Sequence, residues 1–411
     1  MCPMPHALII GGSLGGLISA ALLRQSGWRV TIFERSAGDL AGRGAGLGIS
    51  EDLLDVLRRV DAHIDPSTGV VIDRYAWVDA AGTTKWDIER PSFASVWPRI
   101  YQPLRALVPD ESYRAGMNLE RVRQDADSVT AIFSDGTQVK GDLLVAADGN
   151  ASTVRRQFLP EVEPRYAGYV AWRGIVEERD MSRAAQAMIF GRIVYSFPDG
   201  ELMLTMPSPG VGEDTRPGFR RCYFIWYRPA PAETKLRELF TDATGRHHGQ
   251  AIPPPLIRLQ FIEEIRQSAH AIFAPALAEI VNLAAQPLLQ AITDMESPRL
   301  TFGRIALVGD SAFIARPHVA AGVTKAALDA QCLADSLAAA NNNVVAALEA
   351  YHTKQHDFGS KLVAHSRYLG AGLENNPGAP PVARDPIRII LDYGAPHLLR
   401  PVDVTRVRPP A

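Results

Sequence analysis

The sequence has few cysteines and no long apolar run. Only Cys2, Cys222 and Cys332 occur in 411 residues and they lie far apart, which argues against a disulfide framework or a zinc site and is typical of a reducing compartment. No apolar stretch approaches the roughly 20 residues of a membrane-spanning helix. The apolar run at residues 7–10 leads into glycines, so no signal peptide is expected. With a net charge of −2, the chain has no overall positive field that would attract nucleic acid or an acidic membrane surface. A cytoplasmic globular protein is expected.

The start of the chain carries the pattern of a dinucleotide-binding βαβ unit. Residues 7–10 predict a buried strand, the glycines between 11 and 16 a turn, and residues 17–34 a helix and a second strand that ends at Glu34. Backbone N–H groups at the start of such a helix bind a pyrophosphate, and the carboxylate binds an adenosine ribose. Ser13 replaces the middle glycine of the usual pattern, so the turn alone is a weak signal, and Glu34 makes dinucleotide binding the favoured interpretation.

Two later strands each end in an acidic loop. Residues 143–146 predict a buried strand before Asp148 and the cationic Arg155, and a further strand precedes Asp310. The Asp310 loop leads to a helix that begins near Gly322, which suits a polyol chain and the electron-rich edge of a flavin ring. A strand-end acid could simply cap the next turn. The two motifs together favour FAD, because a plain NAD-dependent dehydrogenase would leave both acids unexplained.

The middle of the chain predicts a second architecture. Residues 166–228 are rich in aromatic and β-branched residues between turn signals, as in an antiparallel sheet. The expected fold class is therefore α/β, with a Rossmann-like FAD-binding domain and its parallel sheet interleaved with a mostly antiparallel β-sheet substrate domain, followed by C-terminal helices. The expected segments are 1–75, 95–165 and 296–370 for the FAD-binding domain, 76–94 and 166–295 for the substrate domain, and 371–411 for a Pro-rich, mostly irregular tail.

These motifs, in this order and spacing, resemble the flavoprotein aromatic hydroxylases related to p-hydroxybenzoate hydroxylase. The resemblance covers about residues 5–370, and within the family the 2,6-dihydroxypyridine 3-hydroxylase type looks most similar, through residues 165–174 and 316–322. Two features depart from the wider family. The GDAAH run reads GDSAF, without its histidine, and the arginine that often contacts FAD is replaced by Tyr101, with Arg105 as a substitute.

The resemblance implies a set of cofactor contacts. The glycine turn and Glu34 would hold the adenosine diphosphate end, Asp310 the ribityl chain, and Gly322 with Val323 the pyrimidine edge of the flavin. Residues 43–49 would line the flavin, and the loop after Asp148 would serve both FAD and the incoming nicotinamide cofactor. The expected FAD-binding residues are Gly11, Ser13, Leu14, Gly16, Glu34, Arg35, Arg43, Gly44, Asp148, Arg155, Asp310, Pro317, Ala321, Gly322 and Val323.

The resemblance also implies the reaction. NADH or NADPH would reduce FAD, and a flavin hydroperoxide formed with O2 would hydroxylate a small electron-rich ring of the phenol or hydroxypyridine type. A histidine suits the ionisation of the ring hydroxyl, so His318 is the candidate base or substrate contact, with a hydrogen-bonded structural histidine as the alternative. Arg173 is the candidate partner of a substrate oxygen anion, with an ion pair to Glu177 or Glu178 as the alternative. The aromatic substrate candidates are Trp172, Tyr195 and Trp226.

Other functions stay open at this point. An FAD enzyme of this fold could halogenate, epoxidise or reduce its substrate, although the WxWxIP motif of flavin halogenases is absent from the sequence. A non-enzymatic flavin redox sensor would bind FAD without substrate-stimulated oxidation of NAD(P)H. No nucleic acid, membrane or metal partner is expected, and the resemblance suggests a homodimer.

Overall fold

Two sheets organise the computed structural model, which describes residues 4–38, 40, 46–62, 64, 69–374, 385–392 and 397–400. The first has six strands in the order β16-β17-β10-β1-β2-β6 and is parallel apart from the β16 edge. Helix α1 makes a short connection between β1 and β2, as in a dinucleotide-binding fold, whereas β10 and β17 join the sheet from much later in the chain. Its strands are β1 (His6–Ile10), β2 (Arg29–Glu34), β6 (Tyr113–Ala115), β10 (Leu143–Ala146), β16 (Thr301–Phe302) and β17 (Ile305–Leu307).

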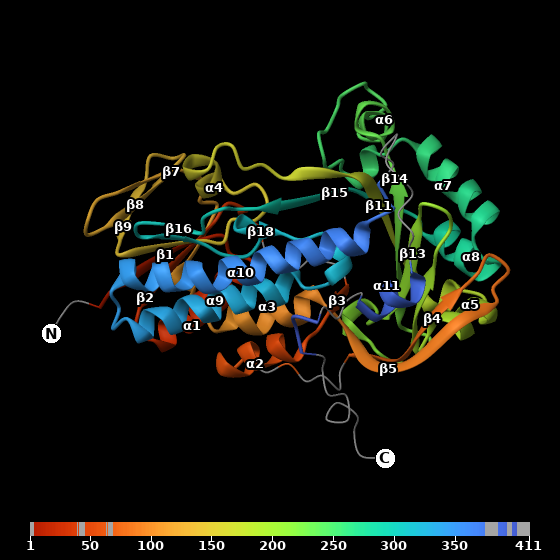
Figure 1. Cartoon of the computed structure of the whole chain (residues 1–411), viewed down its shortest axis with the longest axis horizontal. Helices are drawn as coiled ribbons and strands as arrows, with labels where there is room; N and C mark the ends of the chain where they lie inside the picture. Colours follow the sequence, from red (N-terminus) through yellow and green to blue (C-terminus); the bar gives the residue numbers. More distant parts are fainter. Residues whose placement is uncertain are drawn as a thin grey trace, which may run out of the picture.

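The predicted βαβ unit is present at the start of the chain. All five residues of β1 are buried, and β1 pairs in parallel with both β2 and β10. The connecting helix α1 (Leu14–Gln25) is followed by Gly27, whose φ of +83° fits a glycine after a helix end. The helices α9 (Gly322–Ala339) and α10 (Val344–Gly370) pack on this part of the molecule (Figure 1), and α9 contacts α1. Both C-terminal helices therefore match their prediction.

The second sheet has nine strands in the order β18-β15-β11-β14-β13-β12-β4-β5-β3. Its pairs are antiparallel except β12 with β4, which is parallel. The mostly antiparallel sheet that the sequence predicts is confirmed. Its strands are β3 (Gly46–Gly48), β4 (Val70–Val78), β5 (Thr84–Val96), β11 (Arg165–Glu177), β12 (Arg192–Ser196), β13 (Leu202–Ser208), β14 (Arg221–Pro229), β15 (Leu288–Glu296) and β18 (Phe313–Ile314).

The two faces of the nine-stranded sheet are covered differently. Because side chains alternate along a strand, Val170 and Trp172 of β11 lie in one core with helices α7 (Leu259–Ile272) and α8 (Pro275–Leu283). Tyr169 and Ala171 lie in another core, with residues of the loop before α9, the end of α10 and α11 (Pro386–Asp392). We call these the helix-covered face and the cleft face.

Some elements differ from the sequence-based expectations. Helices α7 and α8 lie inside the segment predicted as antiparallel sheet, and α11 lies inside the segment predicted as an irregular tail. Strand β3 and the start of β4 belong to the second sheet although the domain prediction placed them with FAD, because the chain crosses between the sheets earlier than its composition shows. The remaining elements are α2 (Glu51–Arg59), α3 (Trp97–Ala106), α4 (Thr153–Phe158), α5 (Arg183–Ile189), α6 (Arg237–Leu239) and the sheet of β7 (Leu119–Gln124), β8 (Val129–Phe133) and β9 (Gln138–Gly141).

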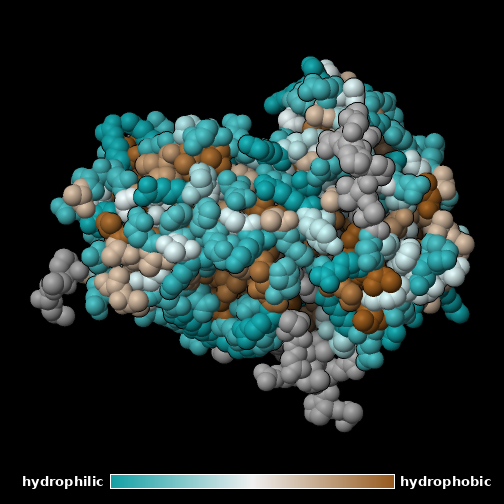
Figure 2. Space-filling model, viewed as in Figure 1, coloured by the Kyte–Doolittle hydropathy of each residue, from teal (hydrophilic) through white to brown (hydrophobic). Residues whose placement is uncertain are grey.

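The surface is mixed in polarity, with scattered apolar areas (Figure 2). Within the described part of the chain, none of the helices has the length and hydropathy that crossing a membrane would need.

Candidate active site

The glycine turn between β1 and α1 has no space for side chains. Gly11 has a φ of +105°, and a Cβ there would lie 2.2 Å from the carbonyl oxygen of Ala147. A Cβ on Gly16 would lie 1.9 Å from the carbonyl oxygen of Gly11. Both glycines are therefore required by close backbone approach, as expected for a turn that presents N–H groups to a pyrophosphate.

Glu34 supports this turn at the end of β2. Its side chain is buried, and its two carboxylate oxygens accept hydrogen bonds of 2.8 Å from the backbone N–H groups of Gly12 and Ser36. The carboxylate is thereby fixed in orientation beside the turn. Each oxygen retains a lone pair, so Glu34 can still accept a ribose hydroxyl.

A pocket opens above the turn, and Asp148 faces it. The Oδ2 atom of Asp148 accepts a hydrogen bond of 2.7 Å from the N–H of Thr153, whereas Oδ1 is buried without a hydrogen-bond partner. Burial raises the pKa of this carboxyl. The orphaned oxygen and the side-chain-free turn fit the diphosphate and ribose of a dinucleotide. The pocket is lined by Ile10, Gly11, Ser13, Phe33, Glu34, Arg35, Leu40, Trp97, Met117, Asn118, Leu119, Ala147, Asp148, Gly149, Ala151 and Thr153.

Arg155 joins the two acidic loops. It is buried on α4, and its guanidinium donates to the carbonyl oxygens of Asn150 at 2.5 Å, Asp310 at 3.4 Å and Ser311 at 3.3 Å. These acceptors are all protein backbone. The direct FAD contact predicted for Arg155 stays a prediction, and the geometry gives the residue a positioning role between the loops.

The Asp310 loop is held from below by an ion pair that sequence reasoning missed. Lys325 and Asp329 are buried on α9, with Nζ 2.5 Å from Oδ2. Lys325 donates to the carbonyl oxygen of Gly309 and Asp329 accepts from its N–H, both at 2.8 Å. A lysine and an aspartate four residues apart on one helix were the available signal. The backbone of Gly309 is thus fixed, while the side chain of Asp310 is exposed.

The loop before α9 faces strand β3. Residues Pro317–Val319 form a short 3-10 turn, and Ala320 has a φ of +47°. A Cβ on Gly48 would lie 3.5 Å from the Cβ of Ala320, so the start of α9, with Ala321, Gly322 and Val323, lies against β3. Residues 46–49 of the predicted flavin-lining segment are therefore close to the α9 N-terminus. Arg43 and Gly44, also predicted to bind FAD, lie outside the described residues.

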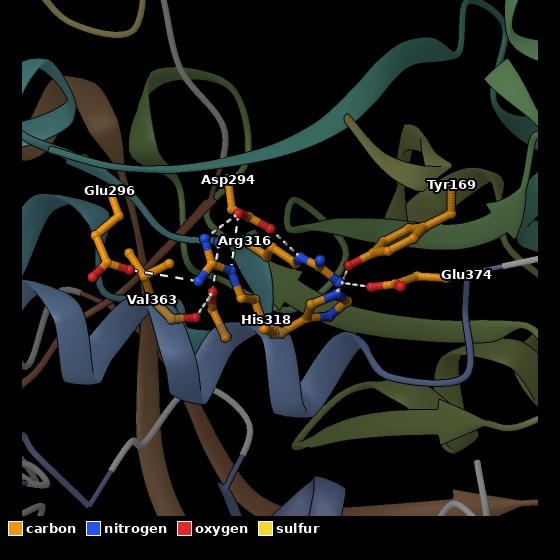
Figure 3. A network of polar contacts seen from close by, with 9 residues as sticks. Tyr169, Asp294, Glu296, Arg316, His318, Val363 and Glu374 are labelled. Atoms are coloured by element: carbon orange, nitrogen blue, oxygen red, sulfur yellow. Dashed lines mark hydrogen bonds and ion pairs between the residues drawn. The ribbon is translucent and has the colours of Figure 1, made fainter. Parts of the chain in front are cut away.

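His318 is fully buried in a network of polar contacts (Figure 3). Its Nε2 lies 2.7 Å from the hydroxyl oxygen of Tyr169, and its ring centroid is 4.4 Å from that of Tyr227. The hydrogen-bonded histidine weighed as the alternative is thus present, and a role for His318 as base or substrate contact stays a prediction.

Arg173 lies on the cleft face, two residues after Ala171. The alternative ion pairs are not formed, because Glu177 pairs with Arg221 and Glu178 with Arg220. Within the described part of the chain the Arg173 guanidinium has neither a hydrogen bond nor an ion pair, and its Nε is buried. A buried donor without a partner is costly, and a ligand acceptor at Nε would relieve that cost. A contact of Arg173 with a substrate oxygen anion stays a prediction.

The three aromatic substrate candidates lie on different faces of the nine-stranded sheet. Trp172 and Trp226 lie in the core beneath α7 and α8, and Trp226 Nε1 donates to Glu201 at 2.5 Å. Their position does not support a substrate contact, because strand alternation points both side chains away from the cleft. Tyr195 is on the cleft face but fully buried between Tyr75 and Phe197, with ring centroids 6.3 and 6.2 Å away.

Tyr101 stands where the resemblance would place an FAD-contacting arginine, and the structure has an aromatic stack at this position. Tyr101 is buried against Trp97, with ring centroids 4.4 Å apart. Arg105 donates to the carbonyl oxygen of Val108 and the carboxylate of Asp110, both at 2.8 Å. Its guanidinium therefore already has protein acceptors, and substitution for the missing arginine stays a prediction.

Comparison with known proteins gives consistent results. A family model described as FAD binding domain-like matches residues 166–294. The chain is 29% identical to the 2,6-dihydroxypyridine 3-monooxygenase of Paenarthrobacter nicotinovorans over 97% of both chains. It is 26% identical to an FAD-dependent urate hydroxylase of Klebsiella pneumoniae over 88% of both.

Solved structures agree. The 2,6-dihydroxypyridine-3-hydroxylase from Arthrobacter nicotinovorans superposes with a TM-score of 0.84 at 28% identity, covering 93% of this chain and 97% of that one. The resemblance and the fold class inferred from the sequence are confirmed. FAD as cofactor and monooxygenation as reaction class agree with these comparisons, because the family model is FAD binding domain-like and the relatives are named as monooxygenases and hydroxylases. NADH or NADPH as co-substrate stays a prediction.

Proposed function

We propose that this chain, an FAD-dependent aromatic monooxygenase that uses NAD(P)H and O2, hydroxylates a small ring that binds as an anion, such as a deprotonated hydroxypyridine. The observation that carries the proposal is Arg173 on the cleft face of the sheet, whose buried Nε has no hydrogen-bond partner among the residues that the structure describes. Relatives named for hydroxypyridine substrates support the ring class, namely the 2,6-dihydroxypyridine and 6-hydroxynicotinate 3-monooxygenases.

The surroundings of Arg173 favour an anionic ligand. Its partners on the neighbouring strands are Ile225 and Leu288, so apolar side chains flank it instead of carboxylates. No carboxylate on these neighbouring positions competes for the guanidinium, and a charge-assisted hydrogen bond to a ring oxygen is stronger than a neutral one. A ring that carries negative charge is also electron-rich, which is what hydroxylation by an electrophilic oxygen requires.

The cofactor contacts are proposed on the geometry described above. The backbone of the Gly11 turn would hold the diphosphate, Glu34 the adenosine ribose, Asp310 the ribityl chain, and the start of α9 at Gly322 the pyrimidine edge of the flavin. When bound there, FAD supplies electron transfer from NAD(P)H and the activation of O2. The chain itself binds and orients the ring and keeps water away.

Strand β3 contributes to the exclusion of water. A Cβ on Gly46 would lie 3.0 Å from the methyl group of Met206 and 3.6 Å from the ring of Tyr223. The glycine therefore lets β3 pack directly on the cleft face. This contact closes the cleft on the side of β13 and β14.

Location and assembly are further parts of the proposal. A cytoplasmic location is supported by three widely spaced cysteines in the sequence. A homodimer is supported by resemblance alone, and light scattering of the purified protein would test it.

The experiment is a spectrum and an oxygen-dependent assay. The purified protein should show a flavin spectrum, and one hydroxypyridine or phenol of a panel should accelerate oxidation of NADH or NADPH in air and yield a product heavier by one oxygen. A neutral ring compound with no ionisable oxygen is the matched control and should give no acceleration. Tight flavin with no acceleration by any compound would favour a redox sensor, and a halogenated or reduced product would favour the other flavin chemistries.

A further inference from the structure

The C-terminal segment is bound both to the nine-stranded sheet and to the nucleotide-binding part of the molecule. Its described residues are 386–392, which include α11, and 397–400, and we call them the C-terminal strap. Figure 1 shows α11 beside strands of the nine-stranded sheet. Ile389, Ile390 and Leu399 are buried in the core of the cleft face. These apolar side chains hold the strap on the cleft face, and polar contacts fix it at two points.

Arg90 of β5 fixes α11 to the sheet. Its Nη1 donates hydrogen bonds to the carbonyl oxygens of Ile390 at 2.9 Å and Leu391 at 3.0 Å. Carbonyl groups in the last turn of a helix have no partner within the helix, so the guanidinium caps α11. The guanidinium carbon also lies 4.6 Å from the ring centroid of Tyr75 on β4. We call this contact the sheet anchor.

Arg400 fixes the other end of the strap to α2. Its backbone N–H donates to Oδ2 of Asp52 at 2.7 Å, and its carbonyl oxygen accepts from the N–H of Glu51 at 3.0 Å. Its Nε donates to Oδ1 of Asp52 at 2.9 Å, and its guanidinium also pairs with the carboxylate of Asp55. The first N–H groups of a helix lack partners within the helix, so the strap completes the start of α2. We call this contact the helix anchor.

The start of α2 lies next to the segment predicted to line the flavin. Only Ile49 and Ser50 separate α2 from β3. The hydroxyl oxygen of Ser50 accepts from the N–H of Leu53 at 3.2 Å and lies 3.0 Å from Oγ1 of Thr324, in the first turn of α9. The helix anchor therefore lies close to the place where β3, α2 and α9 meet.

We infer that Arg90 and Arg400 are positioning residues, which act through the C-terminal strap to hold residues 46–48 beside the start of α9. The inference rests on the proposed function, because these residues line a flavin only in that proposal. The side chain of Arg400 is 61% exposed, and an exposed ion pair contributes little by itself. The loss of one anchor should therefore have a small and measurable effect on FAD binding.

The first test is the dissociation constant of FAD, measured by titration of flavin fluorescence with the flavin-free protein. Arg400→Ala should raise this constant about threefold, as for a lost exposed ion pair, and Arg90→Ala should raise it by a similar factor. Arg400→Lys should restore most of the wild-type value, because an ammonium group can still pair with the carboxylates of α2.

The double variant decides whether the two arginines act through one strap. Arg90→Ala with Arg400→Ala should again raise the dissociation constant about threefold, because the loss of either anchor frees the same segment. Two independent sites would instead give effects that multiply, to about ninefold. Effects that multiply, or no effect of either single variant, would overturn the inference.

Hydrogen exchange of the FAD-loaded enzyme, followed by mass spectrometry, gives a second readout. Backbone amides in the first turn of α2 should exchange faster in Arg90→Ala than in the wild type, although Arg90 contacts α11 and not α2. The matched control is Arg388→Ala, which removes an ion pair of 2.7 Å with Asp392 inside α11 and leaves both anchors in place. Unchanged exchange in Arg90→Ala, or an equal increase in the control, would contradict the inference. An enzyme that binds FAD but is inactive on every ring compound would count only against the proposed function.

Discussion

Along β11, Trp172 packs beneath α7 and α8, whereas Arg173, the next residue, lies on the opposite face of the strand. The helix-covered face is a dry core in which aromatic rings meet edge to face, such as Trp226 and Phe273 at 4.9 Å. The cleft face carries Tyr169 and its contact to His318. One strand therefore packs a core on one side and carries the proposed substrate contact on the other, and a shift by a single residue would exchange the two sides.

The largest expected effect would come from opening the helix-covered face. Trp226→Ala should lower the free energy of unfolding by about 3–5 kcal/mol, because it leaves a cavity in a fully buried core. Denaturant unfolding measures the loss, and Trp226→Phe should lose less. KM for the ring substrate should stay unchanged in the folded fraction. A raised KM without lost stability would mean that Trp226 lines the substrate site and that the two faces do not differ in role.

On the cleft face, the expected effect is on binding. Arg173→Ala should raise KM for the anionic ring about tenfold to a hundredfold, as for a lost charge-assisted hydrogen bond. The free energy of unfolding should change by no more than about 0.5 kcal/mol, since the guanidinium has no protein partner among the described residues. Arg221→Ala, which removes an arginine paired with Glu177, is the control and should leave KM unchanged. An unchanged KM in Arg173→Ala would refute the anion site.

The smallest expected effect is on the pH dependence of stability, and it concerns Asp148 in the nucleotide pocket. Burial raises the pKa of Asp148 above its ordinary value, so its favourable contribution to folding is complete below that value and is lost as pH rises through the raised pKa. The flavin-free wild type should therefore lose stability over this acidic range. Asp148→Asn should remove that part of the pH dependence, as measured by thermal unfolding at a series of pH values. Identical pH profiles would show that Asp148 has the same pKa in the folded and unfolded chain.

Local features of the fold and site could be predicted from the sequence. Gly11, Glu34 and the strand before Asp148 follow from patterns within a few residues, and all lie around one pocket. The direction of Trp172 and Tyr169 was not predicted, because the alternation of Arg173 and Glu177 with apolar residues on β11 does not show which face meets the helices α7 and α8. Lys325 and Asp329 were missed for a related reason, since a buried pair looks like an exposed one in sequence.

The helix pair α7 and α8 was missed because the surrounding segment was interpreted as sheet throughout. Its amphipathic spacing, with Phe261, Ile262 and Ile265 buried on α7, is visible in the sequence. The domain boundaries stay predictions for the same reason, since they depend on where the chain crosses between the two sheets.

The ion pair of Lys325 and Asp329 holds the backbone of the Asp310 loop at Gly309 without using the side chain of Asp310. The hydrogen bonds of Lys325 and Asp329 with the loop both involve backbone atoms of Gly309, so exchange of the Asp310 side chain would leave these two bonds in place. The side chain of Phe313 is linked to the pair more directly, because the Lys325 ammonium lies 5.4 Å from the centroid of its ring. Phe313 packs closely against Gly359 of α10 and the ring of His356. The backbone at Gly309 is thus fixed from α9 whatever side chain stands at position 310. The ring of Phe313, in contrast, is held by contacts with both α9 and α10.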